Sequence, residues 1–189
     1  MAVSRYDQRK NYEEAEANAI GTEYVRAELL PTAGPARVRN LLLQYTGQRI
    51  LFYRVRDREQ LRRIDTETAS LQNRLWSAVV ELTAGQHDPV SALVIAGMND
   101  VLNSQGYTQA AWWNRIPPGA WLLMWLVAIA CNLLVGYGER RTSRMMLLVL
   151  PLIVAVALFL IADIDSPRAG VIRVQPQNLE LLYHGLKGS

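Results

Sequence analysis

The strongest constraint on the fold of this chain is a pair of apolar runs without a charged residue, at positions 117–137 and 145–162. As α-helices they would extend roughly 31 Å and 27 Å, close to the thickness of the hydrocarbon core of a bilayer. Tryptophans, whose rings suit the lipid headgroup level, gather around the start of the first run. They are Trp112, Trp113, Trp121 and Trp125. The pattern predicts a transmembrane hairpin with spans at 117–137 and 145–163. The alternative is a buried helical pair in a water-soluble protein, where two adjacent runs of this length are rare.

The connection between the two spans, residues 138–144, carries Arg140, Arg141 and Arg144. A short basic loop between spans normally lies in the cytoplasm, which would place both termini outside. Residues 1–116, however, begin with a polar segment and carry no secretory signal, so nothing in them explains transport across the membrane. The two arguments disagree, and both orientations stay open.

The region before the hairpin has the periodicity of α-helices and no alternating strand pattern. Ala17, Ile20, Tyr24 and Ala27 mark one apolar face. We expect the acidic side chains to occupy the other faces of that helix; these are Glu13, Glu14, Glu16, Glu23 and Glu28. The expected helices lie at about 4–30, 35–58, 65–84 and 89–114. The chain is therefore predicted to be all-α, with a helical water-facing bundle at 1–116, a two-helix transmembrane hairpin at 117–164 and a tail at 165–189.

Arginines are concentrated in the second expected helix and just after it, and we call the densest part the basic patch. It consists of Arg49, Arg54, Arg56, Arg58, Arg62 and Arg63. Such side chains could hold anionic lipid headgroups, attract anions toward a conduit, or pair with glutamates of the first helix. We favour pairing together with a solvated face. The net charge of +3 and the acids interleaved with the arginines argue against a nucleic-acid partner.

Asn99, Asp100 and Asn103 form a polar stripe on the last helix before the hairpin. A network of hydrogen bonds between helices or subunits is the interpretation that we favour for this stripe. His87 and His184 have no cysteine or carboxylate at ligand spacing, and no catalytic triad, phosphate loop or zinc motif occurs. We therefore expect no enzyme, no catalytic residue and no cofactor.

Three polar residues in or beside the spans are candidate contacts. Asn132 lies deep in the first span, where its amide needs a partner on another helix or in a wet cavity. Asp163 and Asp165 end the second span and are weak candidates for a cation site or for pairing with Arg168. Two carboxylates alone are too few to enclose a hard cation.

Several segments together resemble a bacterial bestrophin-like membrane family, long classed as a domain of unknown function. The most specific are EAEANAIG at 14–21 and DSPRAGVIRVQP at 165–176, and GMNDVLNSQGYTQAAWWNRIPP at 97–118 adds to them. The resemblance covers essentially the whole chain. It implies a relation to anion channels and a further pair of hydrophobic helices upstream, which this chain lacks; with that pair the hairpin would be the second of two.

Two hypotheses of function follow. The first is a subunit of a bestrophin-like ion channel or transporter, a homo-oligomer in the lipid bilayer that passes inorganic ions. The second is a membrane-anchored helical interaction or scaffold protein without conduction. In both, the expected location is a membrane crossed more than once, the inner membrane of a bacterium.

Overall fold

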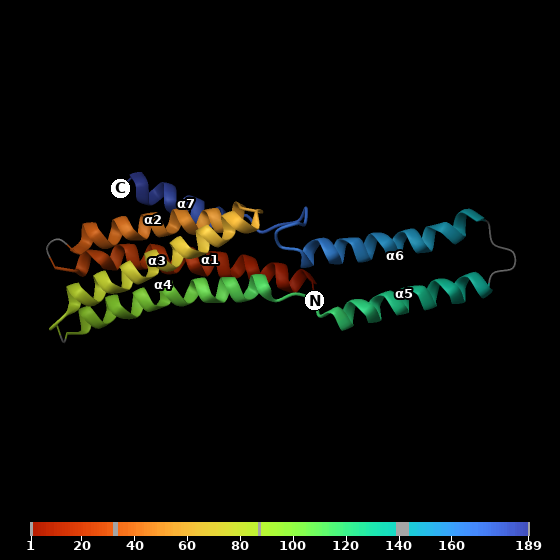
Figure 1. Ribbon diagram of the computed structural model, residues 1–189, viewed down its shortest axis with the longest axis horizontal. Coiled ribbons are helices and arrows are strands. Elements are labelled where there is room, and N and C mark those ends of the chain that lie inside the picture. The colour runs from red at the N-terminus through yellow and green to blue at the C-terminus, as the bar shows by residue number, and fades with distance from the viewer. Residues whose placement is uncertain (1, 32–33, 87, 139–143, 189) are drawn as a thin grey trace. The chain divides into compact units, whose positions relative to one another are not determined.

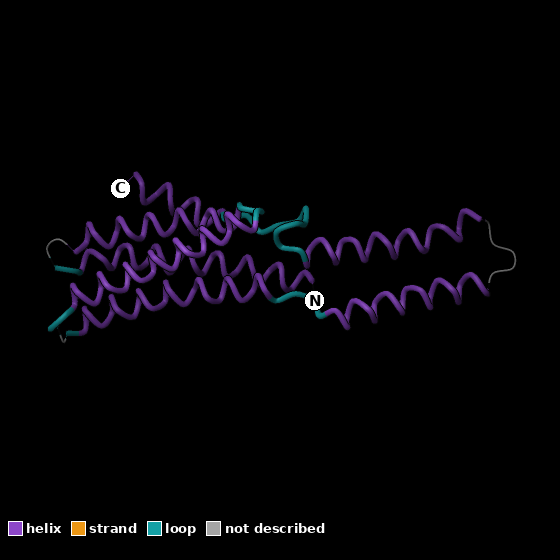
Figure 2. The backbone as a smooth tube through the Cα atoms, in the orientation of Figure 1, coloured by secondary structure: helices purple, strands orange, loops and turns teal. Residues whose placement is uncertain are grey.

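The computed structural model describes residues 2–31, 34–86, 88–138 and 144–188, and all regular structure within these ranges is helical (Figures 1 and 2). The predicted all-α class is confirmed. The elements are α1 (Ala2–Arg26), η1 (Ala27–Leu29), α2 (Gly34–Arg54), α3 (Arg58–Thr83), α4 (Pro89–Trp113), α5 (Pro118–Gly138), α6 (Arg144–Asp165) and α7 (Gln177–Gly188). The chain forms two compact units, one of Asp7–Trp113 with Val174–Ser189 and one of Met1–Tyr6 with Asn114–Arg173.

The first unit is a bundle in which α1 to α4 lie side by side and α7 packs on α2 (Figure 1). Its core contains fully buried apolar side chains from all four long helices, among them Ile20, Leu42, Leu75 and Met98. Within a helix, most buried apolar residues follow one another at three- or four-residue spacing, which gives the helix one inward face. The bundle is therefore held by a continuous apolar core into which, as described below, charged groups are inserted.

Two elements of the bundle differ from expectation. The third helix begins at Arg58 rather than near residue 65, because Asp57 caps it by accepting hydrogen bonds from the N–H groups of Glu59 and Gln60 at 3.0 and 2.8 Å. Residues 165–189 were expected only as a tail, with no helix assigned to them, and the structure shows the helix α7 (Gln177–Gly188) there. The side chain of Leu179 in α7 is fully buried, so the tail is part of the bundle.

The second unit contains the two helices α5 and α6, which contact each other. Two segments of the described chain are long and apolar enough to cross a bilayer, one within Pro89–Tyr137 and the other at Leu148–Asp165. Large apolar side chains on both helices are exposed, including Leu134 and Leu148 at 72% and 71%. Such surfaces suit a lipid environment better than water. Residues 139–143 lie outside the described ranges, so the structure does not bear on the orientation argument from Arg140 and Arg141.

Two aspartates at the end of α6, Asp163 and Asp165, hold the base of the hairpin together by hydrogen bonds. Asp165 is buried and accepts hydrogen bonds from the Ile116 N–H at 3.0 and 3.1 Å and from Arg5 at 3.2 Å. Asp163 accepts the N–H groups of Val171 and Ile172 at 2.7 and 2.8 Å. The two carboxylates thus tie the end of α6 to the start of α5 and to the segment that follows α6.

Candidate functional site

The most unusual chemistry of the bundle lies on the inward face of α1, where charged side chains occupy core positions. Arg9, Glu13, Glu16 and Glu23 are all buried, with exposed fractions of 2% or less. Their spacing of four, three and seven residues places them on the same face of the helix as Ile20. A buried charge is costly unless it is paired and hydrogen-bonded. We call these four residues the α1 charged column.

Glu16 is the centre of a hydrogen-bonded cluster that joins three helices. Its carboxylate pairs with Arg49 of α2, whose Nε and Nη2 both donate to it. Tyr53 of α2 and Thr108 of α4 donate their hydroxyls to Oε2 at 3.3 and 3.1 Å. The Arg49 guanidinium also lies 4.4 Å from the centre of the Phe52 ring. Burial, and secondarily the charge of Glu16, raises the pKa of Tyr53, which keeps its hydroxyl available as a donor.

Glu13 connects α1 to α7. Its Oε1 accepts the Leu179 N–H at 2.9 Å and its Oε2 accepts the Asn178 side-chain amide at 2.7 Å. Glu13 therefore satisfies a free N–H in the first turn of α7, as a capping residue would. Burial raises the pKa of Glu13, and these two hydrogen bonds partly offset that rise.

Arg9 lies at the end of the column nearest the end of α4. Its Nε donates to the carbonyl oxygen of Ala111 at 3.1 Å. That carbonyl belongs to the last turn of α4, where helix carbonyls have no partner within the helix and a cation is favourable. Arg9 thus donates a hydrogen bond to a carbonyl oxygen at the end of α4, much as Glu13 accepts one from an N–H group at the start of α7.

Glu23 differs from the other members of the column. Neither of its carboxylate oxygens has a hydrogen-bond partner within the part of the chain that the structure describes, although the residue is fully buried. It lies against Gly97 of α4, where an added Cβ would be 2.0 Å from Oε2 and 2.5 Å from Nη1 of Arg26. Burial, assisted by the charge of Asp100 and opposed by that of Arg26, raises the pKa of Glu23 to about 8. Glu23 therefore holds its proton at neutral pH.

This arrangement joins helices and holds a proton, and it has no nucleophile–base pair of the kind that covalent catalysis requires. Among the described residues, no group of three or more His, Cys, Asp or Glu side chains could hold a metal ion. The column is best understood as a polar framework inside the bundle.

The basic patch does not form one surface. Arg49 belongs to the Glu16 cluster and is fully buried, so its inclusion in the patch was wrong. The other five members are exposed. Of these, Arg54 pairs with Glu180 of α7 at 2.8 Å and Arg63 with Glu59 at 2.6 Å. Arg39, outside the patch, pairs with Glu28.

The polar stripe on α4 faces outward. Asn99, Asp100 and Asn103 are all exposed, which excludes a buried network between helices of one chain. The helix phase explains this result, because the neighbours Gly97, Met98 and Val101 take the inward positions. A network between subunits stays a prediction.

The candidate contacts in the second unit have nearby partners. Asn132 donates to the carbonyl oxygen of Ala128, one turn earlier in α5, at 2.7 Å. Asn132 also lines a cavity of about 320 Å³ between α5 and α6, opposite Pro151. Asp163 and Asp165 bind the backbone N–H groups and the arginine described above, and it is Arg5 that pairs with Asp165.

Sequence reasoning missed the α1 charged column. It placed Glu13, Glu16 and Glu23 on the outer faces of the helix, and this was wrong for all three. The available signal was the spacing: Arg9, Glu13, Glu16, Ile20 and Glu23 follow one another at four- and three-residue steps, as apolar core positions do. Charged side chains usually face water, so these glutamates were predicted to be exposed although their spacing matches that of core positions.

In a comparison with models of protein families, residues 1–179 matched the Bestrophin-like domain. Neither a curated protein nor a solved structure matched the chain.

Proposed function

The chain belongs to the Bestrophin-like family, and on that basis we propose that it is a subunit of a homo-oligomeric ion channel or transporter in a bacterial inner membrane. In this proposal α5 and α6 cross the bilayer, so that the chain spans the membrane more than once. The bundle of α1 to α4 with α7 forms the part outside the membrane, and inorganic ions are the transported species.

The observation that carries the proposal is the family match, which extends over residues 1–179 and therefore includes α1 to α4 and the hairpin. The family is related to membrane ion channels. Two helices of sufficient length and apolarity, together with the family, indicate a membrane protein. Asn99 and Asn103 of the polar stripe on α4 are exposed, so hydrogen bonds from them to a neighbouring copy are part of this proposal.

The direct test is ion flux through purified full-length protein in liposomes, with chloride, potassium and sodium measured separately. We expect flux of at least one ion and a ring in detergent, a pentamer by analogy with bestrophins. Asn132→Ala should change the flux if Asn132 contacts the ion path, whereas Cys131→Ala on the adjacent position serves as the matched control. Absence of flux for all three ions in repeated preparations would refute the proposal.

A scaffold without conduction is the second candidate, and the geometry of Asn132 favours it. Because its amide donates within α5, the hairpin is compatible with a simple anchor that needs no wet path. This candidate predicts a monomer or dimer in detergent and a specific co-purifying partner. A ring that conducts ions would exclude it.

A further inference from the structure

A groove between α2 and α3 has the chemistry of an anion site. It encloses about 380 Å³ and is lined by side chains that are basic, amide or hydroxyl, together with one leucine. They are Arg37, Asn40, Leu41, Gln44, Asn73, Arg74 and Ser77. No carboxylate is among these lining residues, although carboxylates are common elsewhere on α3. This volume is in the usual range for small-molecule sites.

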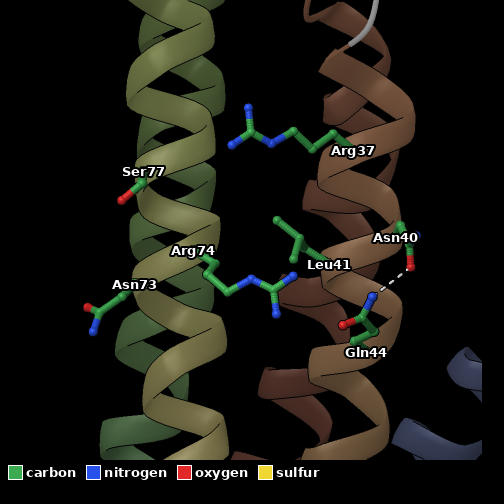
Figure 3. A pocket seen from close by; sticks show the side chains of 7 residues that line it. All are labelled: Arg37, Asn40, Leu41, Gln44, Asn73, Arg74 and Ser77. Carbon is green, nitrogen blue, oxygen red and sulfur yellow. Dashed lines mark hydrogen bonds between the residues drawn. The ribbon is translucent and has the colours of Figure 1, made fainter.

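The two cations of the groove come from opposite walls. Figure 3 shows the guanidinium groups of Arg37, from α2, and Arg74, from α3, extending into the space between the two helices. Like charges that approach each other are unfavourable unless an anion lies between them. Two guanidinium groups on facing walls are well suited to bind the oxygens of one phosphate group.

The two arginines are not equally available. Arg37 is paired with Glu81 at 2.8 Å, whereas Arg74 forms no hydrogen bond or ion pair with any residue that the structure describes. Gln44 donates to Asn40 at 2.9 Å along the α2 wall, which holds both amides in place and leaves their other polar atoms available. Leu41 is buried and closes the floor. Arg74 is thus the cation of the groove that is most available to bind an anion.

We propose that this groove binds a phosphate group, presented either by a free phosphate anion or by a lipid headgroup, between Arg37 and Arg74. The inference does not depend on ion conduction, because it rests on side chains of the bundle alone.

The first test is titration of inorganic phosphate into the full-length protein in detergent, by calorimetry or by the saturable rise in melting temperature that binding produces. Arg74→Gln should weaken phosphate binding about tenfold or more, the loss expected for one hydrogen bond between charged groups. The matched control is Arg62→Gln, which removes the same charge from the same helix. Arg62 lies in a different surface depression, which also contains the acids Glu59 and Glu67, so we expect less than about a twofold change.

A second variant should change the affinity for phosphate in the opposite direction. Glu81→Gln removes the partner of Arg37 and should tighten phosphate binding, whereas a general loss of structure would weaken it. Equal weakening by Arg74→Gln and Arg62→Gln would overturn the proposal, and so would a lack of saturable binding or weaker binding by Glu81→Gln.

Nanodiscs distinguish the two sources of phosphate. Inorganic phosphate should bind equally in phosphatidylcholine discs with and without phosphatidic acid if the groove takes a free anion. If the headgroup is the occupant, phosphatidic acid should raise the apparent Kd for inorganic phosphate in the original protein but not in Arg74→Gln. Both results support phosphate recognition. An equal rise in the Arg74→Gln variant would place the lipid effect elsewhere and would overturn the headgroup assignment.

Discussion

At Arg49 a full positive charge is buried away from water and is paired with one carboxylate, that of Glu16, which accepts from Nε and Nη2 while Nη1 has no hydrogen-bond partner among the described residues. Removal of one partner of such a pair leaves the other charged and buried, which costs far more than the loss of an exposed pair. The residues of the α1 charged column and their buried partners, such as Arg49, are therefore the positions where single substitutions should have the largest effects.

Arg49→Met should lower the free energy of unfolding by about 3–5 kcal/mol, because Glu16 would then be buried without a cation. The matched control is Arg63→Gln, which breaks the exposed pair with Glu59 and should cost less than about 0.5 kcal/mol. Urea unfolding of the purified chain, followed by circular dichroism, measures both. Similar losses for the two variants would show that Arg49 is not buried as described.

Glu23 should make stability depend on pH. Its pKa of about 8 in the folded protein lies above its ordinary value of 4.5, so the unfolded chain releases this proton first as the pH rises. The contribution to stability is complete below 4.5 and is lost as the pH rises toward 8, with a slope of up to about 1.4 kcal/mol per pH unit.

Glu23→Gln removes this titration, so its unfolding free energy should decrease less than that of the original protein between pH 5 and 8.5. Glu67→Gln, at an exposed position of α3, should leave the original slope in place. Unfolding curves at three pH values suffice. Parallel slopes for the original protein and Glu23→Gln would contradict the buried, protonated state of Glu23.

At the scale of elements, the long helices were predictable because apolar periodicity and proline positions are local signals. The start of α3 was placed too late, because Asp57 looked like one more acid in a charged stretch and not like a cap. The inward face of α1 was misjudged because the partners that neutralise Glu13 and Glu16 lie on α7 and α2, far away in the sequence. Burial of a charge depends on such distant partners, and one helix considered alone does not reveal them.

The docking of α7 depends on Glu13, which bonds to the Leu179 N–H and the Asn178 side chain. Glu13→Ala should lower the unfolding free energy by about 1–2 kcal/mol, a typical loss for a helix cap, and should accelerate amide hydrogen exchange along α7. Glu14→Ala, at the exposed next position, is the control and should leave this exchange unchanged. Hydrogen exchange with mass spectrometry gives the readout; unchanged protection of α7 in Glu13→Ala would argue against this anchor.

At the scale of the whole molecule, the two units place different demands on their surroundings. The bundle buries its apolar side chains internally, whereas α5 and α6 expose many of theirs. Such a hairpin requires lipid, detergent or further protein around it. The single cysteine of the chain, Cys131, lies on α5 and is exposed there, so it reports on these surroundings.

A water-soluble maleimide should fail to label Cys131 in intact membranes and should label it after denaturation in detergent, because a charged or strongly polar reagent does not enter the hydrocarbon that surrounds α5. A variant that combines Cys131→Ser with Ser70→Cys moves the thiol to an exposed site on α3 and should be labelled wherever the bundle is accessible. Gel shift of the labelled protein measures both. Rapid labelling of Cys131 in sealed membranes would place this part of α5 in water.

The contact between Glu13 and Leu179 also determines the order in which the protein can mature on the ribosome. Glu13 emerges early, but its partner emerges only after the entire hairpin has been synthesised. Until then the bundle contains a carboxylate without its bonding partners, and α2 lacks the helix that covers it. Completion of the bundle thus follows synthesis of the hairpin, and a nascent chain stalled before residue 179 should be more sensitive to proteases than one that includes α7.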